Sequence, residues 1–258
     1  MIFSHFKRRR GIRFDDGFRH SARERAAPDP DAPPVAGALA NYDAYALDLD
    51  ANDPVAEWGD SASAGPATQE TLAAQPTYAP DVLDSGTPGV EFSGGQYLFL
   101  PDVLKITGDQ EVSAFAVVYL PGSGVGAIYA WADDDSGTRG LYFLRESNNR
   151  MGLSYGGRST FAEGDSFPGD VRTRIRVLGD TDTATATVNG TEVLTVNSGP
   201  ATPGEAVPAL MGARSSGGGS STAGDMIGFI QQLIVYERRL SPAEVAQVQD
   251  WLDERWFL

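Results

Sequence analysis

The sequence contains no cysteine and only two histidines, His5 and His20. Without thiols the chain forms neither a disulfide nor a thiolate metal site, and its redox compartment stays open. Because both histidines precede residue 38, a Ser-His-Asp triad or a histidine metal site in the remainder is excluded. No apolar run approaches a membrane span, so membrane insertion is not expected. Residues 1–20 also lack the apolar core of a signal peptide, so we expect cytoplasmic synthesis without one, unless processing has already removed it.

Charge is divided unevenly along the chain. The formal net charge is −15, but residues 1–26 hold eight Arg or Lys against three acids, which leaves −20 on the remainder. An acidic body repels phosphates, so nucleic acid is not expected as the ligand of that body. A basic segment attached to an acidic body indicates two separate roles.

Residues 1–37 form a basic, proline-rich N-terminal arm. Four prolines between Pro28 and Pro34 favour an extended spacer ahead of the body. Aromatic side chains lie among the basic ones, which suits a segment that anchors the protein to a partner; a disordered, solvated arm and a nucleic-acid contact are the alternatives. The residues predicted to form this assembly anchor are Phe3, Phe6, Lys7, Arg8, Arg9, Arg10, Arg13, Phe14, Phe18 and Arg19.

Beyond residue 38 the pattern is that of short β-strands. The expected strands are rich in β-branched and aromatic residues and are bounded by Gly, Pro or Asp. They cover residues 113–120, 126–132, 140–146, 150–157 and 226–236.

Three further segments complete the strand pattern. Residues 173–178 alternate, which places Arg174 and Arg176 on one face and apolar residues on the other. Asn189-Gly190 joins two alternating runs, and this pair tolerates the positive φ angles of a tight hairpin turn. The Gly- and Ser-rich residues 215–224 predict a flexible loop.

The chain closes in a helix predicted over residues 241–256. Ser241 begins a capping box that Glu244 completes, with Pro242 at the first helical position. Packing against the strands is the expected role of the apolar stripe, with membrane or partner contact as the alternative. The stripe comprises Val245, Val248, Leu252 and Trp256.

The order of these blocks resembles a known family. Residues 55–69, 75–78 and 89–101, followed by the closing strand and helix over 234–256, are similar to laminin-G-like, concanavalin A-like jelly rolls. The resemblance covers roughly residues 40–258. It implies an all-β fold in which residues 38–258 form a two-sheet antiparallel jelly-roll sandwich with a short C-terminal helix.

Glucanases that share this fold carry two acids on one strand, spaced Glu-x-Asp-x-x-Glu or Glu-x-Asp-x-Glu. Glycoside hydrolysis requires such a pair, with one carboxyl protonated and one ionised. The sequence has no such motif, since Glu111, Glu146 and Glu192 occur singly. We therefore predict that the protein is not an enzyme.

Polar hairpin ends are the candidate sugar-binding positions. Amide and guanidinium donors suit sugar hydroxyls, and an aromatic ring suits the C–H face of a sugar, although the same residue types also make ordinary turns. The candidate carbohydrate-binding residues are Asn148, Asn149, Tyr155, Arg158 and Arg214.

Residues 131–140 resemble an oxygen-rich calcium loop. Asp133 and Asp135 are the candidate ligands, and an ordinary Asp-rich turn is the alternative because the EF-hand pattern is absent. No other cofactor is expected.

Domains similar to this one occur in spikes and fibres of tailed phages and phage-like gene transfer agents. The resemblance, the basic arm and the missing catalytic acids lead to the hypothesis of a head spike, fibre or decoration protein on a particle surface. Its partners would be particle structural proteins, through the arm, and host surface polysaccharide, through the sandwich. A free cellular carbohydrate-binding protein and a purely architectural subunit without a sugar ligand are the alternatives.

Overall fold

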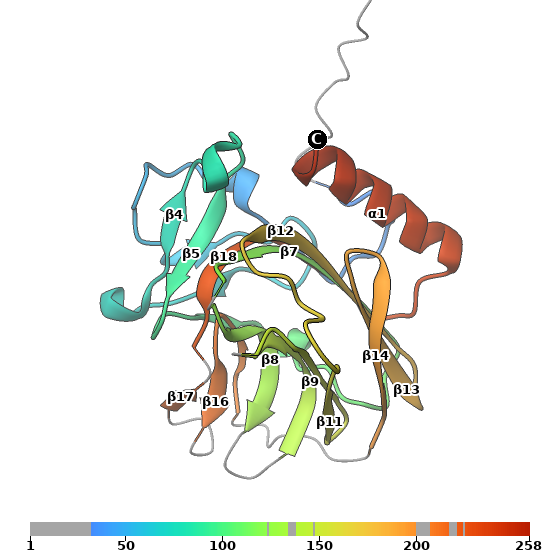
Figure 1. Ribbon diagram of the computed structural model, residues 1–258. Coiled ribbons are helices and arrows are strands. Elements are labelled where there is room, and N and C mark those ends of the chain that lie inside the picture. Colours follow the sequence, from blue (N-terminus) through green and yellow to red (C-terminus); the bar gives the residue numbers. More distant parts are fainter. Residues whose placement is uncertain are drawn as a thin grey trace, which may run out of the picture.

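The computed structural model describes residues 32–122, 124–133, 138–146, 148–199, 207–216, 221–223 and 225–258. These residues form two mostly antiparallel sheets packed face to face, with a helix covering one of them, which confirms the expected fold class (Figure 1). We call the helix-covered sheet A and the other sheet B.

Sheet A brings together strands from the beginning, middle and end of the chain. Across the sheet its strands are β14 (Thr191–Asn197), β13 (Thr183–Val188), β12 (Val171–Gly179), β7 (Val112–Leu120), β18 (Ile227–Tyr236), β5 (Gly89–Ser93) and β4 (Thr77–Ala79), and β1 (Ala40–Asp43) also pairs with β18.

Sheet B is built around the hairpins of the middle of the chain. Across the sheet its strands are β11 (Arg158–Phe161), β10 (Met151–Tyr155), β9 (Thr138–Arg145), β8 (Gly126–Asp133), β15 (Ala209–Met211), β6 (Leu98–Leu100), β3 (Ala67–Thr68) and β2 (Glu57–Trp58), with β16 (Arg214–Ser216) and β17 (Ser221–Ala223) beside β8. Short 3₁₀ turns, η1 (Ala44–Ala46), η2 (Leu72–Ala74), η3 (Val82–Asp84) and η4 (Asp102–Leu104), connect the early strands.

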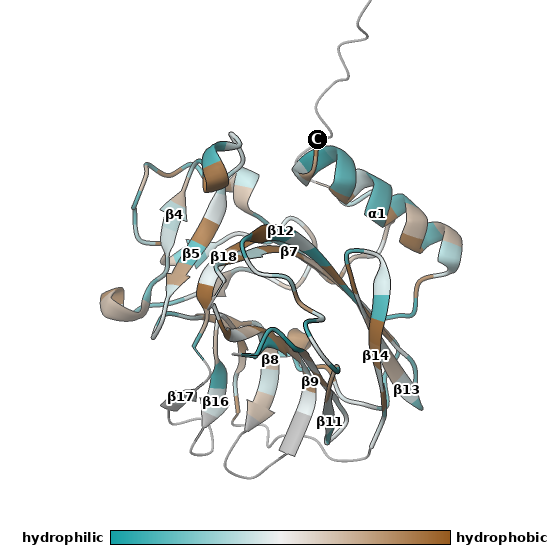
Figure 2. Cartoon of the chain, in the orientation of Figure 1, coloured by the Kyte–Doolittle hydropathy of each residue, from teal (hydrophilic) through white to brown (hydrophobic). Residues whose placement is uncertain are grey.

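The alternation on β12 assigns its two faces as expected. Ile175 and Val177 are fully buried and belong to the core between the sheets, whereas Arg172 and Arg174 project to the opposite face and hydrogen-bond to α1 (Pro242–Trp256). Figure 2 shows apolar residues concentrated along the strands, while much of the visible side of α1 is hydrophilic. This distribution is the one expected for a sandwich with an amphipathic cover.

Helix α1 begins with the predicted capping box. The Ser241 amide donates to Glu244 at 2.8 Å, and the Ser241 hydroxyl accepts from the Glu244 amide at 3.3 Å. All four stripe residues are buried, and each fully buried aliphatic side chain contributes about 1.5–3 kcal/mol to folding. The described helices include none with the length and apolarity that a bilayer crossing requires.

The end of α1 is fixed by a buried ion pair. Arg255 and Asp43 lie 2.6 Å apart, with side chains 5% and 1% exposed. The Arg255 guanidinium also lies 4.5 Å from the Tyr45 ring centroid and 5.5 Å from that of Trp251, so aromatic faces surround the cation.

Two details differ from the sequence-based expectations. Residues 215–224 are not one loop, because β16 and β17 pair there in a small antiparallel ladder. The packed body also includes Val35, which is 6% exposed and whose carbonyl accepts a hydrogen bond from the Tyr236 hydroxyl. The tight turn at Asn189-Gly190 is confirmed, with φ angles of 49° and 85°.

Candidate functional site

The predicted sugar-binding residues do not come together. Asn148 and Asn149 lie in the β9–β10 connection, whereas Arg158 begins β11 at the opposite end of β10, about 13 Å away along the strand. Arg214 lies on β16, four strand positions from β11, or about 19 Å across the sheet. The structure therefore offers no single site formed by this group.

Tyr155 requires a correction. Its side chain is fully buried, and its hydroxyl donates to the Gln110 carbonyl. Burial raises the pKa of Tyr155 above its ordinary value. The ring is part of the core and presents no face to a sugar. Sequence reasoning missed this because the segment around Tyr155 is too short to reveal which face it buries.

Asn149 has a structural role beside Arg145. The Arg145 side chain is 1% exposed, and its Nη atoms donate to the carbonyls of Pro121, Gly122 and Gly124 at 2.7–2.8 Å and to the Asn149 side-chain oxygen. We call this arrangement the Arg145 cage. It ties the β7–β8 loop to the β9–β10 loop, so Asn149 Oδ1 is already occupied.

The calcium and anchor predictions fall largely outside the described residues. Asp135 lies outside them, and β8 ends at Asp133. Among the described residues no group of three or more His, Cys, Asp or Glu is placed to hold a metal ion. Calcium at Asp133 and Asp135 stays a prediction, as does the anchor within residues 1–31, which the structure does not describe.

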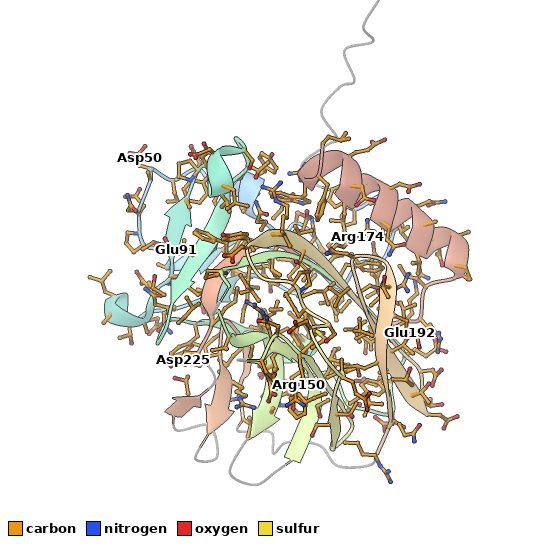
Figure 3. The ribbon with its side chains drawn as sticks, viewed as in Figure 1. Asp50, Glu91, Arg150, Arg174, Glu192 and Asp225 are labelled. Atoms are coloured by element: carbon orange, nitrogen blue, oxygen red, sulfur yellow. The ribbon has the colours of Figure 1, made fainter. Side chains whose placement is uncertain are left out.

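A pocket opens where the end of α1 overhangs the start of β12. Its volume is about 510 Å³, which is within the usual size range of small-ligand sites. In Figure 3 Arg174 lies beneath α1, whereas Arg150 lies on the side of sheet B. We call it the helix-end pocket; it is lined by Val171, Arg172, Arg174, Asn189, Asp253, Phe257 and Leu258.

The hairpin turn between β13 and β14 forms one wall of the helix-end pocket. β12 pairs with β13 only from Ile175 onward, so its first residues extend beyond the turn. Asn189 closes the ladder there, because its side-chain oxygen accepts from the Arg174 amide at 2.9 Å while its own amide donates to the Arg174 carbonyl at 2.9 Å. Its side-chain NH₂ group remains as a donor at the pocket wall.

Arg174 connects this wall to the helix. Its side chain is 14% exposed, and Nη1 donates to the Gln249 carbonyl and pairs with Asp253. The Nε atom is buried and has no hydrogen-bond partner among the described residues. The Nε atoms of Arg145, Arg150 and Arg255 are likewise buried without a partner among the described residues, so this donor does not by itself mark a binding position.

Arg172 fixes the pocket floor to the neighbouring loop. Its guanidinium donates to the side chains of Gln231 at 2.7 Å, Ser85 at 2.7 Å and Thr87, and to the Trp256 carbonyl. Burial lowers the pKa of Arg172 from its ordinary value. All four acceptors are neutral groups.

The lining also presents apolar surface. Val171 is 43% exposed and Phe257 is 38% exposed. A concave surface that combines an aromatic ring with a few fixed donors is able to bind a small polar ring compound. The sequence signal for this site was the alternation of Arg174 and Arg176 on one strand face, but the sequence did not reveal that α1 covers that face.

Comparison with known proteins gives the same fold. A family profile described as "Concanavalin A-like lectin/glucanases superfamily" matches residues 92–246. Curated protein sequences gave no significant match.

Solved structures include similar sandwiches at low identity. Trypanosoma rangeli sialidase in complex with sialic acid superposes with a TM-score of 0.58 and 15% identity, over 87% of this chain and 34% of the sialidase. Domain 4 of AbnA, a GH43 extracellular arabinanase from Geobacillus stearothermophilus, in complex with arabinotriose, gives 0.55 and 16%, over 83% and 98% of the two chains. Ruminococcus gnavus IT-sialidase CBM40 bound to α2,3-sialyllactose gives 0.50 and 14%, over 62% and 95%.

These likenesses establish the fold and not the ligand. This chain spans about a third of the trypanosomal sialidase but matches almost the whole of the arabinanase domain. The described sandwich therefore has the fold of concanavalin A-like lectins and glucanases.

Proposed function

The chain belongs to the concanavalin A-like lectin/glucanase superfamily, and from this premise we propose that it is a carbohydrate-binding structural component of a phage-like particle. In this proposal the sandwich contacts a host surface polysaccharide, and the N-terminal arm attaches the protein to the particle as a spike, fibre or decoration protein.

The helix-end pocket is the observation that carries the sugar-binding part of the proposal. It combines a partly exposed ring, Phe257, with donors on Arg174 and Asn189 in a cavity of about 510 Å³. Sugars offer hydroxyls to such donors and a C–H face to such a ring. Similar sandwiches carry bound sugars, as the arabinotriose complex of the arabinanase domain illustrates.

The charge distribution supports the particle-bound part of the proposal. Residues 1–26 carry five net positive charges on a chain of net charge −15, so arm and body favour different partners. A weak sugar contact gains avidity when many copies on one particle bind together.

Sugar binding is tested with the full chain on a glycan array. We expect binding to at least one bacterial polysaccharide fragment, and a loss of tenfold or more in affinity, about 1.4 kcal/mol, in Phe257→Ala. Phe99→Ala is the matched control, because this phenylalanine is 39% exposed and lies on β6 of sheet B. Absence of binding to every glycan would favour the architectural alternative.

Attachment is tested by deleting residues 1–30 and following incorporation into particles. We expect the shortened protein to remain in the soluble fraction while the full chain sediments with particles. Incorporation of the shortened protein would refute the anchoring role of the arm. A full chain that binds sugar but does not sediment with particles would favour a free cellular carbohydrate-binding protein.

A further inference from the structure

We infer that the first 31 residues of the N-terminal arm dock on the outer face of sheet A of the same chain, at the end of α1. This inference concerns where the arm lies while no partner holds it, and it goes beyond the proposed function. It depends on the apolar side chains that this face exposes, on the acids around them, and on the composition and reach of the arm.

Helix α1 ends before the strands of sheet A do. Trp256, the last residue of α1, accepts a hydrogen bond from Arg172 through its carbonyl. Across the sheet Arg172 pairs with Tyr119 on β7, which in turn pairs with Phe229 on β18. Ile227 comes two residues before Phe229 and therefore lies on the same face, farther from the helix. We call Tyr119, Phe229 and Ile227 the sheet-end patch.

The sheet-end patch is apolar and accessible. Ile227 is 44% exposed, and the rings of Tyr119 and Phe229 are both partly exposed, with centroids 6.0 Å apart. The hydrophobic core formed by the described residues includes none of the three. A segment that covers them gains about 25 cal/mol for each Å² of apolar surface removed from water.

The η3 turn places a fourth apolar side chain beside the patch. A Cβ on Gly89 would lie 2.9 Å from Val82 and 3.4 Å from Phe229, so η3 and the patch are neighbours. Leu83, the next residue of η3, is 48% exposed and has a φ of 66°. This left-handed conformation costs a residue other than glycine about 1–3 kcal/mol, and such strain is concentrated at functional positions. Here it accompanies an exposed apolar side chain.

Acids lie around the sheet-end patch. Glu91 lies across the β18–β5 ladder from it, and the Tyr119 hydroxyl hydrogen-bonds to Asp170. Asp84, in η3, is exposed. Arg172 lies in the same row, but its guanidinium is already bonded to neutral groups. Three acids and one arginine give these side chains a net charge of −2, so the surface suits a cationic ligand that also carries aromatic rings.

The arm matches this surface in both charge and apolarity. Residues 1–26 hold eight Arg or Lys against three acids, and the four phenylalanines Phe3, Phe6, Phe14 and Phe18 lie among them. Phenylalanine rings cover apolar surface, while the neighbouring guanidinium groups pair with carboxylates.

The arm is also long enough to reach the patch within one chain. The described residues begin at residue 32, and the Val35 carbonyl accepts from the Tyr236 hydroxyl at the opposite end of β18 from Ile227. That strand spans about 30 Å, whereas 31 residues extend up to about 100 Å. A tether of this kind gives an effective concentration of order millimolar, so docking within one chain prevails over docking between copies in dilute solution.

Because the chain has no cysteine, introduced thiol pairs test this docking in the full-length protein. Ser4→Cys places a thiol between two arm phenylalanines, and Ser93→Cys places one across the ladder from Ile227. With a short bismaleimide crosslinker in dilute solution, we expect this pair to join within one chain at least tenfold faster than the matched pair Ser4→Cys with Thr195→Cys. Thr195 is exposed and lies on β14 at the far edge of sheet A.

Changes in the patch separate docking from chance encounter. Phe229→Ala and Glu91→Gln should each slow the crosslinking of the first pair by threefold or more, and 1 M salt should slow it because part of the attraction is between charges. Melting curves check that the variants fold, and Ile227→Ala, at a more exposed side chain, replaces Phe229→Ala if that variant does not. Equal rates for the two pairs, or a product that joins two chains, would overturn the inference. Either result leaves particle attachment and sugar binding standing, because both are measured separately.

Discussion

The Arg145 cage and the helix-end pocket both hold guanidinium groups away from solvent, but they satisfy them differently. In the cage three backbone carbonyls and the Asn149 oxygen accept from the two Nη atoms of Arg145. In the pocket Arg174 bonds through Nη1 alone, and the Nε atoms of both arginines lack a partner among the described residues. The first cation is enclosed by its own loops, whereas the second faces an open volume of about 510 Å³.

This difference separates a structural arginine from a candidate binding arginine. The cage bonds both Nη atoms of Arg145 and is explained by the loops that it joins. In the pocket Arg174 makes fewer hydrogen bonds than Arg145 does, and exposed apolar residues lie beside it. The comparison predicts that changes in the cage reduce stability, while changes in the pocket reduce binding.

The largest expected effect is that of Arg145→Met. Removal of the guanidinium leaves four acceptors without their donor, and at about 1–3 kcal/mol for each unsatisfied buried group the free energy of unfolding should fall by about 4 kcal/mol or more. Urea denaturation measures this loss. Arg150→Met is the control, because its side chain is 36% exposed and its ion pair with Glu146 should be worth less than about 1 kcal/mol.

The ion pair at the end of α1 joins a buried guanidinium, that of Arg255, to the buried carboxylate of Asp43. Arg255→Met leaves Asp43 charged and 1% exposed, so we expect a loss of about 3–4 kcal/mol in unfolding free energy. Replacing both residues, as Asp43→Asn with Arg255→Met, should recover part of this loss. A double variant as unstable as the sum of the single ones would show that the two charges do not interact.

Features that depend on neighbouring residues were predictable from the sequence. The Asn189-Gly190 turn and the Ser241–Glu244 cap each need only a few adjacent residues, and both are confirmed. The pocket depends on a contact between Arg174 and Asp253, 79 residues apart, which no local pattern encodes. Tyr155 failed as a sugar contact for the same reason, since only the packing of the two sheets determines that it is buried.

Binding of a glycan in the helix-end pocket should also raise the free energy of unfolding. At a concentration one hundred times its dissociation constant, a glycan that binds the helix-end pocket should raise the unfolding free energy of the full chain by about 2.7 kcal/mol. The same concentration should have little effect on Arg174→Gln. Thermal melting with and without the glycan measures both, and equal stabilisation of the two proteins would place the binding site elsewhere.

The smallest expected effect concerns Glu244, at the exposed start of α1. Its Oε1 lies 2.8 Å from Nη2 of Arg238. Hydrogen bonds from Arg238 and then from Ser241 lower the pKa of Glu244 from 4.5 to about 2. Because the pKa is lower in the folded state, this stabilisation is complete above pH 4.5 and is lost as the pH falls toward 2. Denaturation at pH 6 and pH 3 should show a smaller pH dependence in Glu244→Gln than in the parent protein. Since both side chains are about one-third exposed, 1 M salt should shrink that difference, and an undiminished difference would indicate that hydrogen bonding to the cap outweighs the charge.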